Sequence, residues 1–170
     1  MRTLLQVAVA LVLASVAASP GGAKGFADKD LARLETAASR ALGEGFSGQA
    51  RDGRLILTCS ACSGEPIVSI EFGRQTDGTE QRVRAGTTTV ADLEKLCRLR
   101  SEECRISALE VAPAVGWVSR WTIGSSAAAT AILIRDGDLL TIRSVAADGE
   151  TARRQIDALL PVVRTSIVGR

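Results

Sequence analysis

Residues 127–146 read AAATAILIRDGDLLTIRSVA and carry the clearest fold signal in the chain. Two mainly apolar runs, Ala127–Arg135 and Asp138–Ala146, lie on either side of Asp136-Gly137. An Asp-Gly pair between two such runs is a strong signal for the two-residue turn of a β-hairpin. We therefore expect two long antiparallel strands in the C-terminal third of the chain.

The sequence before this hairpin predicts further strands. A second Asp-Gly turn, Asp52-Gly53, joins runs at residues 46–50 and 54–59. The remaining predicted strands are residues 66–73, 106–111 and 117–123, together with residues 80–84, which we expect at an exposed sheet edge.

Two segments in the first two thirds of the chain have the apolar spacing of helices. One covers residues 31–42 and has Asp28 or Asp30 as its N-cap. The other begins at Thr89, and Asp92 stands where the second residue of a capping box is expected.

A last helix follows Asp148-Gly149 and carries its apolar residues on one face. Pro161 has no N–H to donate to Asp157, so we expect a kink or a break there. Because hairpins connect most strands and each helix has one apolar stripe, the predicted fold class is α+β. It is a mainly antiparallel sheet packed with about three helices, as a sandwich.

The run from Ala131 to Arg143, followed by this amphipathic helix, is similar to the end of a PsbP-type sandwich. The similarity covers about the last 45 residues and lies in the order of the elements. It implies, by analogy of fold, an accessory or binding protein and not an enzyme.

The N-terminus has the features of a secretory signal peptide. Arg2 supplies a positive charge, residues 4–18 are uncharged and largely apolar, and small residues follow. The apolar run is shorter than the roughly 20 residues that span a bilayer. We expect residues 1–18 to be the signal peptide, with cleavage between positions 18 and 23. A flexible leader (residues 19–27) and a single domain (residues 28–170) would then act in the periplasm or as a secreted protein.

The composition weighs against several classes of function. The 21 basic and 19 acidic residues give no basic stripe for nucleic acid and no polybasic membrane patch. No second apolar run is long enough for stable membrane insertion after cleavage. The chain has no histidine, which excludes Ser-His-Asp and Cys-His catalysis and histidine metal ligands. We expect neither a metal nor a cofactor.

Four cysteines predict two disulfides in an exported chain: Cys59, Cys62, Cys97 and Cys104. Three pairings are open, and the local one, Cys59 with Cys62 and Cys97 with Cys104, is favoured. Seven residues of continuous helix would separate Cys97 and Cys104 by about 10 Å, so this pairing requires the helix to end between them.

Two other readings of these cysteines stay open. Cys59 and Cys62 have the spacing of thiol–disulfide oxidoreductases, but a strand and not a helix is expected after them. A zinc site built from all four cysteines is the third reading, although the gap between Cys97 and Cys104 departs from the usual short spacing.

A candidate binding surface consists of Trp117, Arg120 and Trp121. The two tryptophans share one face of the predicted strand, and Arg120 lies on the other face. The alternative, which we favour, is that the tryptophans pack under a helix, because tryptophan is highly buried on average.

Three hypotheses of function follow. The first is a non-catalytic accessory, binding or chaperone-like domain, whose partner is a protein or a small apolar ligand held between sheet and helices. The second is thiol–disulfide exchange by Cys59 and Cys62. The third is a secreted inhibitor or immunity-type protein that exposes a rigid loop at residues 113–116.

Overall fold

The computed structural model describes residues 25–170, and the predicted signal peptide lies outside this range. In chain order the elements are α1 (Leu31–Leu42), β1 (Ser47–Arg51), β2 (Arg54–Thr58), β3 (Ile67–Arg74), α2 (Thr79–Arg84), α3 (Val90–Arg98), β4 (Arg105–Ala108), β5 (Val115–Ile123), β6 (Ser126–Arg135), β7 (Asp138–Ala146), α4 (Gly149–Val163) and the π-helical turn η1 (Arg164–Val168). The α+β class is confirmed.

The strands form one seven-stranded antiparallel sheet in the order β1-β2-β3-β7-β6-β5-β4. Both predicted Asp-Gly hairpins are confirmed as the β1–β2 and β6–β7 connections. In each turn the aspartate and the glycine have positive φ: 49° and 74° at Asp52 and Gly53, and 51° and 80° at Asp136 and Gly137. Two consecutive residues of this kind match the twist of the strands that they join.

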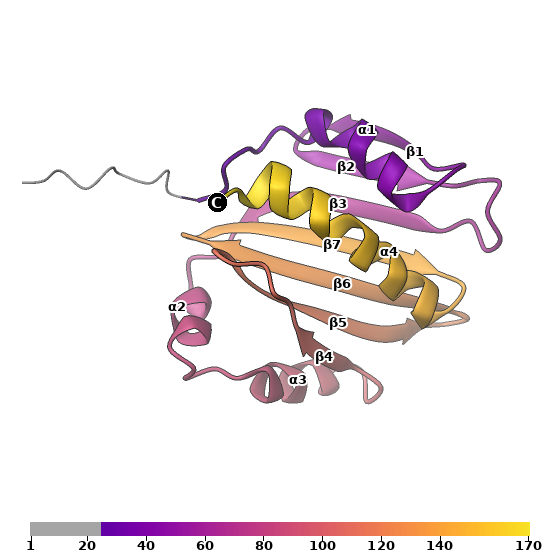
Figure 1. Ribbon diagram of the computed structural model, residues 1–170. Helices are drawn as coiled ribbons and strands as arrows, with labels where there is room; N and C mark the ends of the chain where they lie inside the picture. The colour runs from indigo at the N-terminus through magenta and orange to yellow at the C-terminus, as the bar shows by residue number, and fades with distance from the viewer. Residues whose placement is uncertain (1–24) are drawn as a thin grey trace, which may run out of the picture.

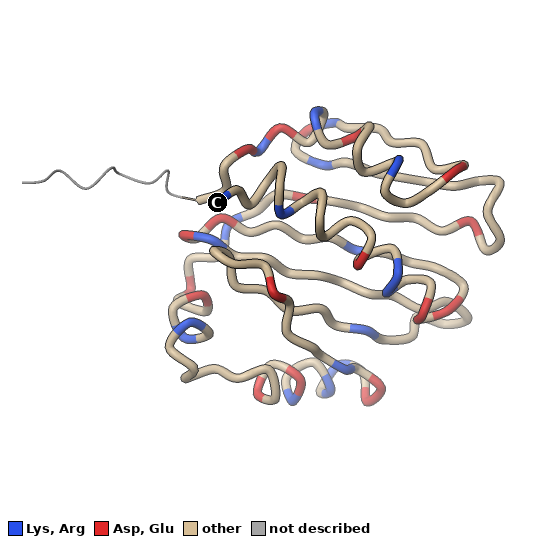
Figure 2. Tube along the Cα trace, in the orientation of Figure 1, with Lys and Arg blue, Asp and Glu red and all other residues tan. Residues whose placement is uncertain are grey.

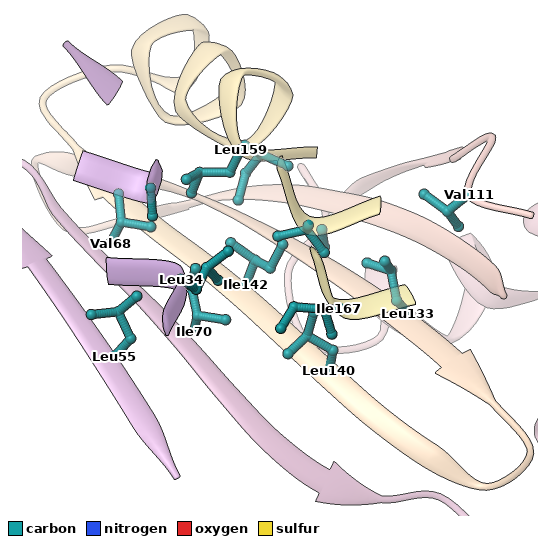
Figure 3. Close-up of a cluster of buried hydrophobic side chains, with 14 of the residues drawn as sticks. Leu34, Leu55, Val68, Ile70, Val111, Leu133, Leu140, Ile142, Leu159 and Ile167 are labelled. Carbon is teal, nitrogen blue, oxygen red and sulfur yellow. The ribbon is translucent and has the colours of Figure 1, made fainter. Parts of the chain in front are cut away.

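Helices α1 and α4 lie on the same face of the sheet (Figure 1). The strand register places one residue from each of five neighbouring strands in a row beneath them: Leu55, Ile70, Ile142, Ala131 and Val118. All five have an exposed fraction of 0%. Leu34 of α1 and Leu159 of α4 close this core from the helix side (Figure 3). Burial of this apolar layer is the main stabilising contribution to the fold.

The opposite face of the sheet is not covered by α1 or α4. In Figure 1, α2 and α3 lie beyond the β5–β4 edge and not over the middle of the sheet. Lys, Arg, Asp and Glu are concentrated on helices, turns and strand ends, whereas the long strands carry few of them (Figure 2).

Residues 79–84 form helix α2, so the exposed edge strand predicted for residues 80–84 is wrong. The reason is Glu80, whose side chain is only 3% exposed and accepts hydrogen bonds from the backbone N–H groups of Asp136 (3.0 Å) and Gly137 (2.9 Å). Arg84, one helical turn later, pairs with the same carboxylate at 2.7 Å. A helix brings both side chains to the β6–β7 turn, which an edge strand could not do.

Pro161 does not split the last helix, because α4 continues through it to Val163. Pro161 is exposed, and on the solvent side the carbonyl that loses its partner can tilt toward water. The irregularity comes three residues later, where the chain widens into η1.

The folded unit begins before Asp28. Phe26 is 4% exposed and packs against Phe72 with ring centroids 6.0 Å apart. The backbone N–H groups of Gly25 and Phe26 donate to Asp136 and Asp138 at 3.1 Å. Residues 25–27 are therefore part of the domain, although they fall in the segment predicted as a flexible leader.

Candidate functional site

The segment between β3 and β4 holds α2 and α3 at the β4 edge of the sheet. Thr89 caps α3 with the predicted capping box, since its hydroxyl accepts from the Asp92 N–H and the Asp92 carboxylate accepts from the Thr89 N–H. The Glu94 carboxylate accepts a hydrogen bond of 2.8 Å from the Ile106 N–H on β4. A disulfide between Cys97 and Cys104 then ties the end of α3 to the start of β4.

Helix α3 is amphipathic but buries none of its residues. Val90 and Leu93 are half-buried, and Leu96 and Leu99 are 63% and 84% exposed. An apolar helical stripe is normally covered by a neighbouring element. In this protein the apolar stripe of α3 faces an open space instead.

That space is a cleft of about 540 Å³ between α2–α3, the start of β5 and the chain that leads into it. The cleft is lined by Val83, Val90, Leu93, residues 108–112, residues 114–117 and Arg164. Apart from Glu110 and Arg164, every lining residue is apolar or glycine, and Trp117 supplies the largest apolar side chain.

The lining determines what the cleft can do. It contains no serine, cysteine or lysine that could act as a nucleophile. It offers an indole ring, aliphatic side chains and two charged groups, which is the composition of a site that binds an apolar group.

The structure separates the members of the predicted Trp117, Arg120 and Trp121 surface. Trp117 lines the cleft, whereas Arg120 and Trp121 meet in a second hollow of about 330 Å³ beside the start of α4. Arg120 lies 3.5 Å from Glu150 there. Both tryptophans are half-buried, and neither lies under α1 or α4, because they point to the opposite sheet face.

The helix-free face of the sheet also carries apolar side chains. The register places Trp121, Val145 and Ile67 in one row, with Ile56 in the next. Ile56 and Ile67 are 39% and 49% exposed. These four side chains form a second apolar patch, and none of them lines the cleft.

Cys59 and Cys62 are joined in the connection between β2 and β3. Cys59 is 1% exposed, and Gly45 lies so close that an added Cβ would stand 2.8 Å from its Sγ. Strand β3 follows this connection, so the motif does not lead into a helix, as the reactive Cys-x-x-Cys of oxidoreductases does. With Cys97 and Cys104 also paired, all four cysteines are in disulfides.

Two buried carboxylates fix the elements around the site. Burial raises the pKa of Asp138, but hydrogen bonds from Lys29 and the Phe26 N–H, the Lys29 charge and Arg74 outweigh burial, so the pKa lies below 3.8. Burial likewise raises the pKa of Glu80, and Arg84 with the two turn N–H groups lowers it below its usual 4.5. Both side chains are therefore charged at neutral pH and anchor the β6–β7 turn.

Sequence reasoning missed the cleft, although it predicted α3 and its capping box. The lining comes from positions as distant as Val83 and Arg164, and no local pattern shows that they meet. The available signal was α3 itself, whose apolar stripe at Val90, Leu93 and Leu96 needs a partner.

Within residues 25–170, no group of three or more His, Cys, Asp or Glu side chains is arranged to hold a metal ion. In the same range, no helix has both the length and the apolar character needed to cross a membrane.

No protein-family model matches the chain, and no curated protein matches its sequence. The fold is similar to a crystal structure from Bacteroides thetaiotaomicron VPI-5482, with 7% identity and a TM-score of 0.43, over 75% of this chain and 43% of that one. This chain thus spans less than half the length of the Bacteroides chain. The fold is also similar to the solution structure of cyanobacterial PsbP (CyanoP) from Synechocystis sp. PCC 6803, with 13% identity and a TM-score of 0.42, over 90% and 97% of the two chains. Likenesses of this strength say nothing about a ligand or a partner.

Proposed function

We propose that the protein is a non-catalytic accessory domain that acts in the periplasm or as a secreted protein and holds an apolar group in the cleft beneath α2 and α3. The observation that carries this proposal is the cleft itself, an open space of about 540 Å³ lined almost entirely by apolar side chains. Apolar surface left in contact with water is costly, so a ligand that covers it gains the free energy of its burial.

Two disulfides support a location outside the cytoplasm, because reducing conditions in the cytosol keep most thiols unpaired. The signal-like N-terminus supports the same location.

The alternative functions have less support. Thiol exchange by Cys59 and Cys62 requires an accessible thiol, and Cys59 is 1% exposed in a motif that leads into a strand and not a helix. An inhibitor that uses residues 113–116 requires a protruding loop, but Ala114 is 6% exposed and Val115 and Gly116 belong to β5. Pro113, Val115 and Gly116 are half-buried, so the segment offers less free surface than a protruding inhibitory loop.

A protein partner is the second candidate. The specific observation is the helix-free sheet face, where Ile56, Ile67 and Trp121 place apolar area in contact with solvent. Charged substitutions at Ile56 and Ile67 would remove such a partner and leave the cleft intact.

Binding of an apolar group in the cleft is tested with N-phenyl-1-naphthylamine, a neutral dye whose fluorescence rises in an apolar site. Leu93→Glu places a charge in the lining of the cleft, whereas Leu96→Glu places the same charge three residues along α3, where the side chain is 63% exposed. Wild type and Leu96→Glu are expected to bind the dye, and Leu93→Glu is expected to lose it. Far-UV circular dichroism and urea unfolding establish that both variants are folded.

Equal dye binding by both variants, or no binding by wild type, would contradict the proposed function. Loss of binding in Leu96→Glu alone would place the site on the outer surface of α3 and not in the cleft.

A further inference from the structure

The cleft has a neighbour of different chemistry. A cavity of about 470 Å³ lies at the end of α4 and is lined by Ala112, Pro161, Arg164, Thr165, Gly169 and Arg170. Ala112 and Arg164 also line the apolar cleft, so the two spaces adjoin. The second cavity thus presents two arginine side chains and no carboxylate side chain in its lining.

Arg164 is the residue that joins the two spaces. Its side chain is exposed and makes no ion pair or hydrogen bond among residues 25–170. Arg84, by contrast, is paired with Glu80. An unpaired guanidinium beside an apolar cleft is available to an anion that the ligand itself brings.

The end of a helix would normally repel an anion, because its last carbonyl groups carry partial negative charge. Several main-chain oxygens at this end already have donors. The Ile167 carbonyl accepts from the Ala27 N–H at 2.8 Å, and Arg135 donates to the main-chain oxygens of Val168 and Arg170. Arg164 is the charged side chain that lines both this cavity and the apolar cleft.

We propose that the ligand is a single-chain anionic amphiphile of the fatty-acid type, with its chain in the apolar cleft and its carboxylate at Arg164 in the adjoining cavity. This inference rests on the proposed function, since it names the ligand class of the same cleft. The apolar lining takes the hydrocarbon chain, and Arg164, with Arg170 beyond it, fixes the end at which the charge lies. Glu110 lines only the apolar cleft, which disfavours the opposite orientation of an anionic ligand.

The test compares oleate with oleyl alcohol, which has the same chain and no charge. Affinities are measured for the full mature protein by displacement of the neutral dye, below the concentration at which either lipid forms micelles. Oleate is expected to bind wild type roughly tenfold more tightly than the alcohol, as one charge-assisted hydrogen bond at a solvent-accessible site provides. Arg164→Gln is expected to remove this preference for oleate, and Arg164→Lys is expected to retain part of it. Arg98 is exposed on α3, and the control Arg98→Gln is expected to leave the preference unchanged.

The outcomes separate the two proposals. If oleate and the alcohol bind equally, or Arg164→Gln weakens both alike, the anionic ligand is wrong while the apolar cleft stands. If neither lipid displaces the dye and the dye itself does not bind, the proposed function fails as well. If Arg98→Gln removes the preference as Arg164→Gln does, the charge effect comes from the whole surface and not from Arg164.

Discussion

At the scale of single residues, Asp138 connects segments that lie far apart in the chain. Its side chain is 3% exposed, pairs with Lys29 and Arg74 at 2.6 Å each, and accepts the Phe26 N–H. Because the pKa of Asp138 lies below 3.8 in the fold, the charged form is favoured by folding. Its stabilising contribution is present above that pH and is lost as the pH falls through the lowered pKa.

Asp138→Asn is therefore expected to reduce the free energy of unfolding at neutral pH by about 1–3 kcal/mol, because a buried acceptor of two cations loses its charge. The difference between wild type and variant is expected to shrink as the pH falls from about 3.8 through the lowered native pKa, because the unfolded chain binds a proton there before the native carboxylate does. Urea unfolding at neutral and acidic pH measures both.

Asp157→Asn is the matched control, since the Asp157 side chain is 46% exposed and pairs with Arg153 on the surface of α4. An exposed ion pair contributes only about 0–1 kcal/mol. A loss as large as that of Asp138→Asn would show that burial does not decide the effect.

At the scale of elements, the Cys97–Cys104 disulfide is a covalent tie between α3 and the start of β4. A helix of 9 residues that buries none of them is not stable alone. Replacing both cysteines by serine removes a tie of roughly 2 kcal/mol in the chain-entropy model. Helix α3, which forms one wall of the cleft, then detaches from the sheet part of the time. The apparent affinity for the dye is therefore expected to fall.

The pair Cys59→Ser and Cys62→Ser serves as the control for this variant. That disulfide lies between β2 and β3, away from the lining of the cleft, so its removal is expected to reduce stability and leave dye affinity unchanged. Dye binding that is lost in this control and kept without Cys97–Cys104 would contradict the role given to α3.

The helices show which elements a sequence pattern can predict. Helix α3 followed from Thr89 and Asp92, because a capping box is local chemistry. Helix α2 did not, because five of its six residues are polar and the segment has no apolar stripe at helical spacing. What makes it a helix is the contact of Glu80 with the β6–β7 turn, which lies more than 50 residues away and leaves no local pattern.

At the scale of the whole molecule, the sheet was predictable and the site was not. The hairpin at residues 127–146 and its counterpart at Asp52-Gly53 depend on neighbours in sequence, so the antiparallel sheet follows from them. The cleft depends on how distant segments pack, from Val83 to Arg164, and no local pattern in the sequence shows that these segments meet.

The extent of the domain is tested by truncation. A chain that begins at Gly25 is expected to be as stable as one that begins at Ser19. A chain that begins at Asp28 is expected to lose about 3–5 kcal/mol, since it lacks the buried Phe26 side chain. Thermal or urea unfolding of the three chains measures this, and equal stability of all three would contradict the placement of Phe26 in the core.

The most direct test of the central claim, that an apolar ligand occupies the cleft, uses the two tryptophans of the chain. Trp117 lines the cleft and Trp121 does not, and four residues of strand separate them by about 13 Å. A bromine-labelled long-chain alcohol quenches tryptophan emission on contact and is titrated into Trp121→Phe and Trp117→Phe. We predict quenching of Trp117 in the first variant and none of Trp121 in the second. Quenching of Trp121 alone, or of neither tryptophan, would contradict the binding of an apolar ligand in the cleft.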